Sequence, residues 1–154
     1  MNDKYNTYEK VKDLFTNRIP DEEWNTFFIM FNYAGIEGTS LNAYTNNRQY
    51  FDGLLIGLGN NGGIAFYKLL RGKMLLKKQV KNMSLIDNSL KYFPKSYIDR
   101  VDIKYSKLNK KVINVHLRFT TNESYNLKIK INSVDLPYQN EGIHKFINKY
   151  KRER

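Results

Sequence analysis

The order of apolar and polar positions divides the chain into a helical first third and a strand-rich remainder. Tyr8, Val11, Leu14 and Phe15 recur at the three- and four-residue spacing of an amphipathic helix. This spacing predicts a short helix over about residues 8–16.

A second helix is predicted from Pro20 to about Gly35. Proline is tolerated in the first turn of a helix, and the acidic residues 21–23 favour the positive end of the helix dipole. Trp24 and the phenylalanines at 27, 28 and 31 then share one broad helical face, which we interpret as hydrophobic core rather than as a ligand site. Residues 36–49 are polar and turn-rich, which indicates a linker.

From Tyr50 onward the spacing of apolar residues changes from that of helices to that of strands. Residues 50–58, 63–70, 73–79 and 83–87 are short, apolar or alternating, and Asn/Gly clusters or single glycines separate them. This pattern predicts an antiparallel meander.

Later segments alternate more regularly. In residues 100–105, 113–119 and 125–131, apolar side chains at odd-numbered positions alternate with polar ones at even-numbered positions, which predicts three strands with one solvated face. A three-residue turn at 121–123 joins the last two. The register that follows pairs Phe119 with Tyr125, Arg118 with Asn126, His116 with Lys128, and Asn114 with Lys130.

The chain is predicted to end in an amphipathic helix. Ile143, Phe146, Ile147 and Tyr150 repeat at helical spacing, and basic residues lie on the opposite side and in the last turn.

About seven short antiparallel strands closed by one carboxy-terminal helix is the outline of a pleckstrin-homology-like split barrel. Over residues 50–151 the sequence resembles bacterial members of that superfamily. The resemblance lies in the strand pair around Leu54 to Tyr67, in Phe93-Pro94-Lys95-Ser96-Tyr97-Ile98 leading into Val101-Asp102-Ile103-Lys104, in the 111–131 hairpin and in the 140–151 helix. It implies an α+β, mainly antiparallel barrel domain at 50–154, with a helical extension and linker at 1–49.

The resemblance also implies a binding module for lipid headgroups or protein segments rather than an enzyme. One feature departs from the family. Phosphoinositide-binding members use basic residues around the loop between the first two strands, but here Gly59 to Gly62 contains no cation, and the nearest are Lys68, Arg71 and Lys73. The resemblance therefore implies a binding scaffold more than a phosphoinositide site.

Charge is unevenly distributed along the chain. Residues 1–62 carry 5 Lys/Arg against 8 Asp/Glu and residues 63–154 carry 21 against 7, so the net charge changes from −3 to +14. Lysine, a hydrated point charge, outnumbers arginine 19 to 7, which favours non-specific attraction of anions over base reading. A compositional origin in an A+T-rich coding sequence is the alternative.

The chain has no cysteine, so disulfides and thiolate metal sites are excluded. The first thirty residues lack the pattern of a secretory leader, and the most apolar stretch, Trp24 to Ile36, is too short to span a bilayer. We therefore predict a soluble, cytoplasmic protein.

Residues 57–62, Gly-Leu-Gly-Asn-Asn-Gly, match the GxGxxG string of dinucleotide-binding proteins. A dinucleotide fold needs a helix after this string, but the next apolar run reaches Gly72 after seven residues. The string therefore favours a tight hairpin turn over a nucleotide site.

No catalytic or metal-binding motif is present. His116 and His144 are joined by no motif, and Asp21, Glu22 and Glu23 are assigned to a helix start rather than to general acid–base chemistry. We therefore predict no catalysis, no metal and no cofactor.

The outward face of the three late strands is the candidate site. Its cations form a candidate anion-binding set with no aromatic side chain for stacking on bases: Arg100, Lys104, His116, Arg118, Lys128 and Lys130. An ordinary solvated face is the alternative interpretation.

Two functions follow as hypotheses. The first is a non-catalytic module whose basic surface holds an acidic protein partner or anionic lipid headgroups. The second is non-specific nucleic-acid binding, with phosphates contacted by Lys104, Arg118, Lys128 and Lys130. An enzyme site between the aromatic helix and the barrel is a third alternative, and the oligomeric state stays open.

Overall fold

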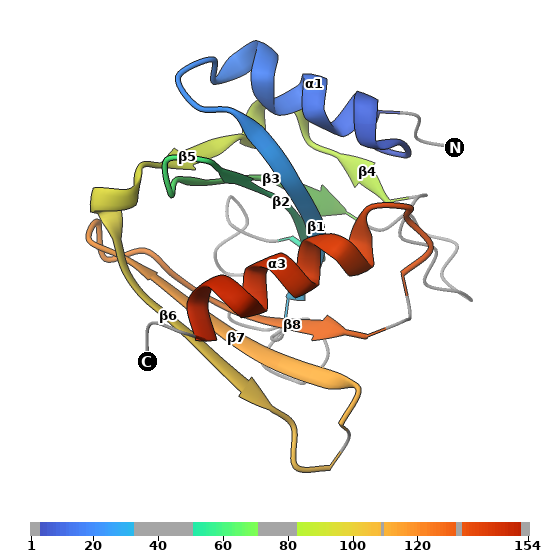
Figure 1. Cartoon of the computed structure of the whole chain (residues 1–154), viewed down its shortest axis with the longest axis vertical. Coiled ribbons are helices and arrows are strands. Elements are labelled where there is room, and N and C mark those ends of the chain that lie inside the picture. Colours follow the sequence, from blue (N-terminus) through green and yellow to red (C-terminus); the bar gives the residue numbers. More distant parts are fainter. Residues whose placement is uncertain (1–3, 33–50, 71–82, 109, 132–133, 152–154) are drawn as a thin grey trace.

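The computed structural model describes residues 4–32, 51–70, 83–108, 110–131 and 134–151, which contain two α-helices and eight β-strands (Figure 1). The chain begins with α1 (Tyr8–Arg18) and β1 (Trp24–Asn32), followed by the hairpin of β2 (Gly53–Gly59) and β3 (Ile64–Leu70). The remaining elements are β4 (Ser84–Leu85), the 3₁₀ helix η3 (Asp87–Ser89), β5 (Lys91–Phe93), the 3₁₀ helix η4 (Lys95–Tyr97), β6 (Ile98–Tyr105), β7 (Val112–Phe119), β8 (Ser124–Lys130) and α3 (Gln139–Lys151).

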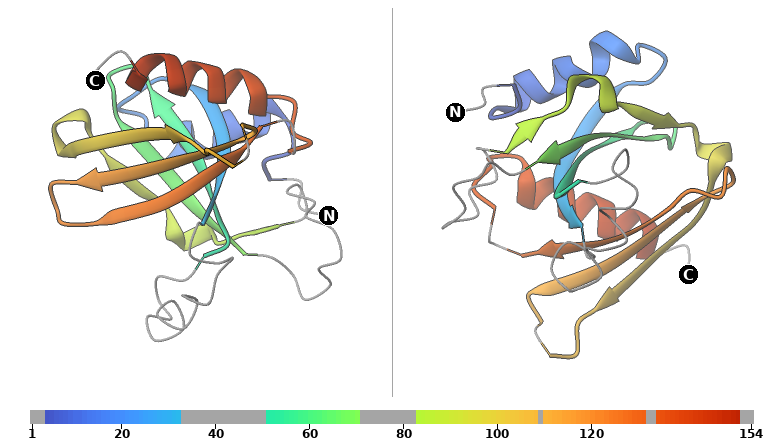
Figure 2. Two further views of the ribbon diagram at one scale, coloured as in Figure 1. Left: turned by 90° about the horizontal axis from the view of Figure 1, so that it is seen from below. Right: turned by 180° about the vertical axis from the view of Figure 1, so that it is seen from behind.

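The strands form one strongly curved, open sheet of antiparallel pairs. Its order is β4-β3-β2-β1-β8-β7-β6, with β5 also paired to β3 (Figure 2). Two meanders, β1 to β4 and β6 to β8, meet at the β1–β8 seam, where Phe31 pairs with Lys128 and Asn32 with Leu127. Among the described residues, the end strands β4 and β6 do not pair with each other. The predicted α+β class, the antiparallel strands and the carboxy-terminal helix are confirmed.

The predicted helix from Pro20 to Gly35 is wrong, because Trp24–Asn32 is the strand β1 in the middle of the sheet. Its run of large apolar residues is buried on both faces, and a strand buried on both faces loses the alternation that identifies strands. The expected core role of the aromatic residues is confirmed, since Trp24, Phe27, Phe28 and Phe31 are all buried.

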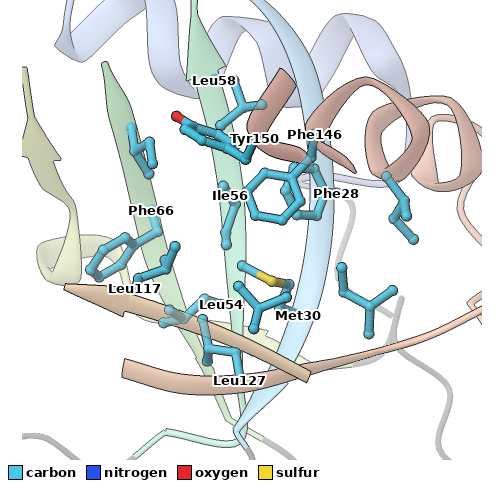
Figure 3. Packing of buried hydrophobic residues seen from close by; sticks show 14 of the residues in the cluster. Phe28, Met30, Leu54, Ile56, Leu58, Phe66, Leu117, Leu127, Phe146 and Tyr150 are labelled. Carbon is cyan, nitrogen blue, oxygen red and sulfur yellow. The ribbon is translucent and has the colours of Figure 1, made fainter. Parts of the chain in front are cut away.

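Two hydrophobic clusters lie on opposite faces of the central strands. One fills the inside of the curved sheet beneath α3 and contains Phe28, Met30, Phe66 and Phe146 (Figure 3). The other lies between α1 and the outer side of β1 to β3, where Phe15 stacks on Phe27 with ring centroids 5.5 Å apart. Each helix therefore covers one face of β1.

Helix α3 approaches the backbone of β1 closely at its first turns. The buried Gln139 side chain accepts a hydrogen bond from the Ile29 N–H (2.7 Å) and donates one to the Ile29 carbonyl (2.9 Å). These two bonds supply partners for the backbone groups of β1 beyond the point where β8 stops pairing with β1. At Gly142 a Cβ atom would lie 2.0 Å from the Phe27 carbonyl oxygen, so only glycine fits.

The β7–β8 hairpin differs from its predicted register by two residues. Phe119 pairs across the turn with Glu123 through a 2.9 Å backbone bond, and Asn122 adopts φ 72°, a conformation that asparagine tolerates better than most residues. The three-residue turn therefore covers 120–122 rather than 121–123. The observed pairs are Leu117 with Tyr125, Arg118 with Ser124, His116 with Asn126, Asn114 with Lys128 and Val112 with Lys130.

Most other expected elements are present. The helices expected at 8–16 and near the carboxy terminus correspond to α1 and α3, and the late strands to β6, β7 and β8. The linker at 36–49, the strand at 73–79 and the domain boundary between 49 and 50 lie outside the described residues.

Within the described part of the chain, no helix is both long enough and apolar enough to cross a bilayer.

Candidate functional site

The six candidate anion-binding residues lie on the same face of the β6–β7–β8 sheet. A shift of two residues preserves side-chain parity, so the register error leaves every even-numbered side chain on the face opposite the core. Arg100 pairs with Arg118, Asp102 with His116 and Lys104 with Asn114.

Lys128 is buried rather than solvated, with 9% relative exposure. It pairs with Phe31 across the seam, so β1 covers it on the side that the prediction left open. Its neighbour Lys130 is half-buried, with its Nζ 5.8 Å from the centroid of the Phe31 ring. Lys128 and Lys130 are therefore less accessible to a ligand than the prediction assumed.

The arginines at the other end of the face are balanced by acids. Arg100 Nε lies 2.8 Å from Asp102 Oδ2, and Arg118 Nε lies 3.5 Å from Asp99 Oδ2. Asp99 joins this face because the pairing of β6 is irregular between Ile98 and Arg100. Since each arginine has a carboxylate beside it, this end of the face has little net charge.

A hollow of about 400 Å³ lies in the middle of the face. It is lined by Asp102, Lys104, Asn114, Val115, His116, Asn126 and Leu127. His116 Nδ1 lies 2.6 Å from Asn126 Oδ1, which orients the imidazole ring. Asn114 Oδ1 is buried and has no hydrogen-bond partner in the described part of the chain. The hollow thus offers both donors and acceptors with Lys104 at its edge.

A cluster of exposed lysines, which the sequence analysis did not single out, lies at the turn between β6 and β7. Lys107, Leu108, Lys110 and Lys111, called here the basic hairpin tip, are all exposed, and the Leu108 side chain is 100% exposed. Within the described part of the chain, Lys107 and Lys110 form no ion pair. A leucine among lysines between two predicted strands was the available signal.

The basic hairpin tip continues into the candidate face. Lys104 lies on the adjoining end of β6, and Lys130 pairs with Val112 at the start of β7. Residues 103–114 and 124–131 contain no Asp or Glu, and the nearest acid of β6 is Asp102, which lines the hollow with Lys104. In Figure 1 this end of the molecule lies opposite α1.

The GxGxxG string forms the predicted hairpin turn, and its backbone already binds an anionic group. Oε1 of Glu22 accepts hydrogen bonds from the N–H groups of Asn61 (3.0 Å) and Gly63 (3.2 Å), and the Tyr92 hydroxyl donates to Oε2. The assignment of Glu22 to a helix start is therefore wrong. Burial and the hydrogen bond to Glu22 raise the pKa of Tyr92 to about 12.

A second polar cluster lies at the open side of the sheet. Lys91 of β5 donates to Glu123, which lies between the 120–122 turn and β8, and the Tyr125 hydroxyl donates to the same carboxylate at 3.0 Å. Burial opposes ionisation of Glu123, but these hydrogen bonds outweigh it and lower its pKa. Burial and then the nearby Lys91 lower the pKa of Lys68. This cluster joins the two meanders.

Among the described residues, no group of three or more His, Cys, Asp or Glu side chains is placed to hold a metal ion.

No protein-family model matches this chain, no curated protein matches its sequence, and no solved structure matches its fold.

Proposed function

We propose that the chain is a non-catalytic binding module with a pleckstrin-homology-like split-barrel architecture. Two antiparallel meanders joined at one seam, with a carboxy-terminal helix over the inside of the curved sheet, support this proposal. Side chains bridge the open side, where the Phe93 and Phe119 rings stack with centroids 3.7 Å apart.

The module binds an anionic lipid surface through the basic hairpin tip. The observation that carries this proposal is the fully exposed Leu108 flanked by Lys107, Lys110 and Lys111. A protruding leucine suits insertion among acyl chains, and each lysine near an anionic membrane contributes about 1 kcal/mol of attraction. Lys104 and Lys130 extend the positive surface away from the tip.

An acidic protein segment is the main competing ligand, and the hollow beside Lys104 is where it would lie. Non-specific nucleic-acid binding has less support, because two of its four proposed phosphate contacts are compromised. Lys128 is buried, and Arg118 is paired with Asp99.

Co-sedimentation with vesicles tests the lipid proposal. At low salt the protein is expected to pellet with vesicles containing phosphatidylserine and to stay in the supernatant with neutral vesicles. Binding is expected to weaken as salt rises, because salt screens the surface charge. Equal pelleting with both vesicle types, or with neither, would contradict the proposal.

Two variants of the basic hairpin tip, and one control variant on α1, locate the binding surface. Replacing Lys107 and Lys110 by alanine removes about 2 kcal/mol of attraction and is expected to weaken binding roughly thirtyfold. The matched variant Lys10→Ala/Lys12→Ala removes the same charge from α1 and is expected to bind almost as well as the wild type. Leu108→Ser separates insertion from charge, since it removes the apolar side chain without changing the net charge and alters a side chain that packs against nothing in the described chain. Retained binding in both tip variants would place the site elsewhere, and an acidic-peptide titration of the hollow would then be decisive.

A further inference from the structure

Among the described strands, β6 has no partner along its outer edge. β6 is eight residues long and lies last in the strand order, and no described strand pairs with its outer side (Figures 1 and 2). Helix α3 contacts β6 at its end, where Lys151 Nζ lies 6.0 Å from the centroid of the Tyr105 ring. Proteins ordinarily shorten, cover or interrupt such edges, because a free row of backbone groups pairs readily with another strand.

The hydrogen-bond pattern identifies which backbone groups face outward. The Ser106 N–H donates to the Val112 carbonyl of β7 at 2.9 Å. In an antiparallel pair, alternate residues direct both their N–H and C=O groups to the neighbouring strand. Counting back from Ser106, the residues that direct both groups away from β7 are Val101, Ile103 and Tyr105.

We infer that two copies of the chain associate edge to edge through β6, in an antiparallel register centred on Ile103. A two-fold axis through Ile103 pairs Ile103 with Ile103 of the second copy, and Val101 with Tyr105. These are the three residues whose backbone groups are available, so one continuous ladder of hydrogen bonds forms across the interface.

The side chains on the outer face agree with this register. Asp102 of each copy lies opposite Lys104 of the other, so the interface contains two identical pairs of opposite charge. One neighbouring register sets Asp102 against Asp102 and Arg100 against Lys104, which places like charges face to face. The other sets Lys104 against Lys104. A register centred on Val101 would set Arg100 against Asp102, but it extends into the irregular part of β6 between Ile98 and Arg100. The register centred on Ile103 is therefore the one that is both self-complementary and regular.

Exposed apolar groups lie at both ends of the same strand. Within the described residues, the large hydrophobic side chains more than one-third exposed are Tyr8, Tyr97, Tyr105 and Leu108. Tyr105 ends β6, Tyr97 precedes it directly and Leu108 follows it in the turn. Tyr105 is 50% exposed, and the proposed register packs it beside Val101 of the second copy. Association would therefore cover apolar surface that the single chain leaves in water.

Charge variants test the register directly. In Asp102→Lys, the new side chain at position 102 of each copy faces Lys104 of the other, so both cross-strand pairs consist of two lysines. In Lys104→Asp, both pairs consist of two aspartates. Each variant alone is expected to weaken self-association about tenfold or more, measured by sedimentation equilibrium at physiological ionic strength. An equimolar mixture of the two is expected to form heterodimers, since every cross-strand pair is then of opposite charge. The double variant Asp102→Lys/Lys104→Asp is expected to restore the homodimer.

A backbone variant provides a second, independent test. Val101→Pro removes an N–H that faces away from β7, so it spares the intramolecular ladder but blocks the proposed one. It is expected to be monomeric with a circular dichroism spectrum like that of the wild type. A wild-type chain that stays monomeric at high micromolar concentration, or single charge variants that dimerise as well as the wild type, would overturn the inference.

Discussion

The carboxylate of Glu22 joins three parts of the chain that are distant in sequence. It lies just before β1, accepts hydrogen bonds from the turn between β2 and β3, and receives the hydroxyl of Tyr92 next to Phe93 in β5. The group is buried, with 6% relative exposure, and a Cβ at Gly59 or Gly63 would collide with it. Two glycines and one acid thus form a single structural unit at this corner.

Removing this carboxylate should destabilise the fold. Glu22→Ala leaves two backbone N–H groups and one hydroxyl without their acceptor, and each buried unsatisfied group costs about 1–3 kcal/mol. We expect the free energy of unfolding, measured by urea denaturation, to fall by about 3 kcal/mol. The control Tyr92→Phe removes one of the three hydrogen bonds and should cost about 1 kcal/mol. A loss in Glu22→Ala no larger than that of the control would show that the turn does not depend on Glu22.

At the scale of elements, the strands with one solvated face were predictable, and so was the glycine-bounded hairpin of β2 and β3, whereas the strand β1 was not. The alternation in β6, β7 and β8 follows from one face meeting the core, whereas β1 meets a helix on each face. Trp24, Phe27, Phe28 and Phe31 satisfy helical spacing and also a continuous buried strand, so spacing alone does not decide between them.

The candidate face of β6, β7 and β8 was likewise predictable from the sequence only in part. Its parity was predictable because a strand has a period of two, and parity survived the shifted turn. The burial of Lys128 was not predictable, because it depends on which strand lies beside β8 in space. The basic hairpin tip was visible in the sequence as a leucine among lysines, but its exposure depends on the turn pointing away from the sheet.

Helix α3 gives a prediction at this scale, because its approach to β1 reverses the usual effect of a glycine substitution. Gly→Ala inside a helix ordinarily stabilises by about 1 kcal/mol. In Gly142→Ala the new methyl group would lie 2.0 Å from the backbone oxygen of Phe27, so the helix must shift. We expect thermal denaturation to show a loss of about 2 kcal/mol or more.

Asn148→Ala, at an exposed position of the same helix, serves as the control and should be neutral or slightly stabilising. A Gly142→Ala protein as stable as the wild type would mean that α3 and β1 are less closely packed than described.

At the scale of the whole molecule, polar contacts across the open side make stability depend on pH. The folded-state pKa of Glu123 lies below its ordinary value of 4.5, so the folded protein holds this proton less tightly than the unfolded chain. The contribution is therefore complete above pH 4.5 and is lost as the pH falls through the folded-state value.

We expect the melting temperature of the wild type to exceed that of Glu123→Gln at neutral pH, with the difference shrinking as the pH falls below 4.5. Lys91→Met removes the principal partner of Glu123. In a protein that carries Lys91→Met, adding Glu123→Gln should therefore change the melting temperature less than it does in the wild type. A difference between wild type and Glu123→Gln that stays constant from pH 7 to pH 3 would contradict this account.

The seam between β1 and β8 also has a consequence for how the chain folds. Phe31 and Asn32 must find Lys128 and Leu127, which lie near the other end of the chain, before the two meanders become one sheet. Closing so long a loop delays the contact, and topologies dominated by distant pairings refold in milliseconds to seconds rather than microseconds. During synthesis, β1 leaves the ribosome long before β8 and α3. Phe28 and Met30 therefore lack their packing partners from β8 and α3 until those elements emerge.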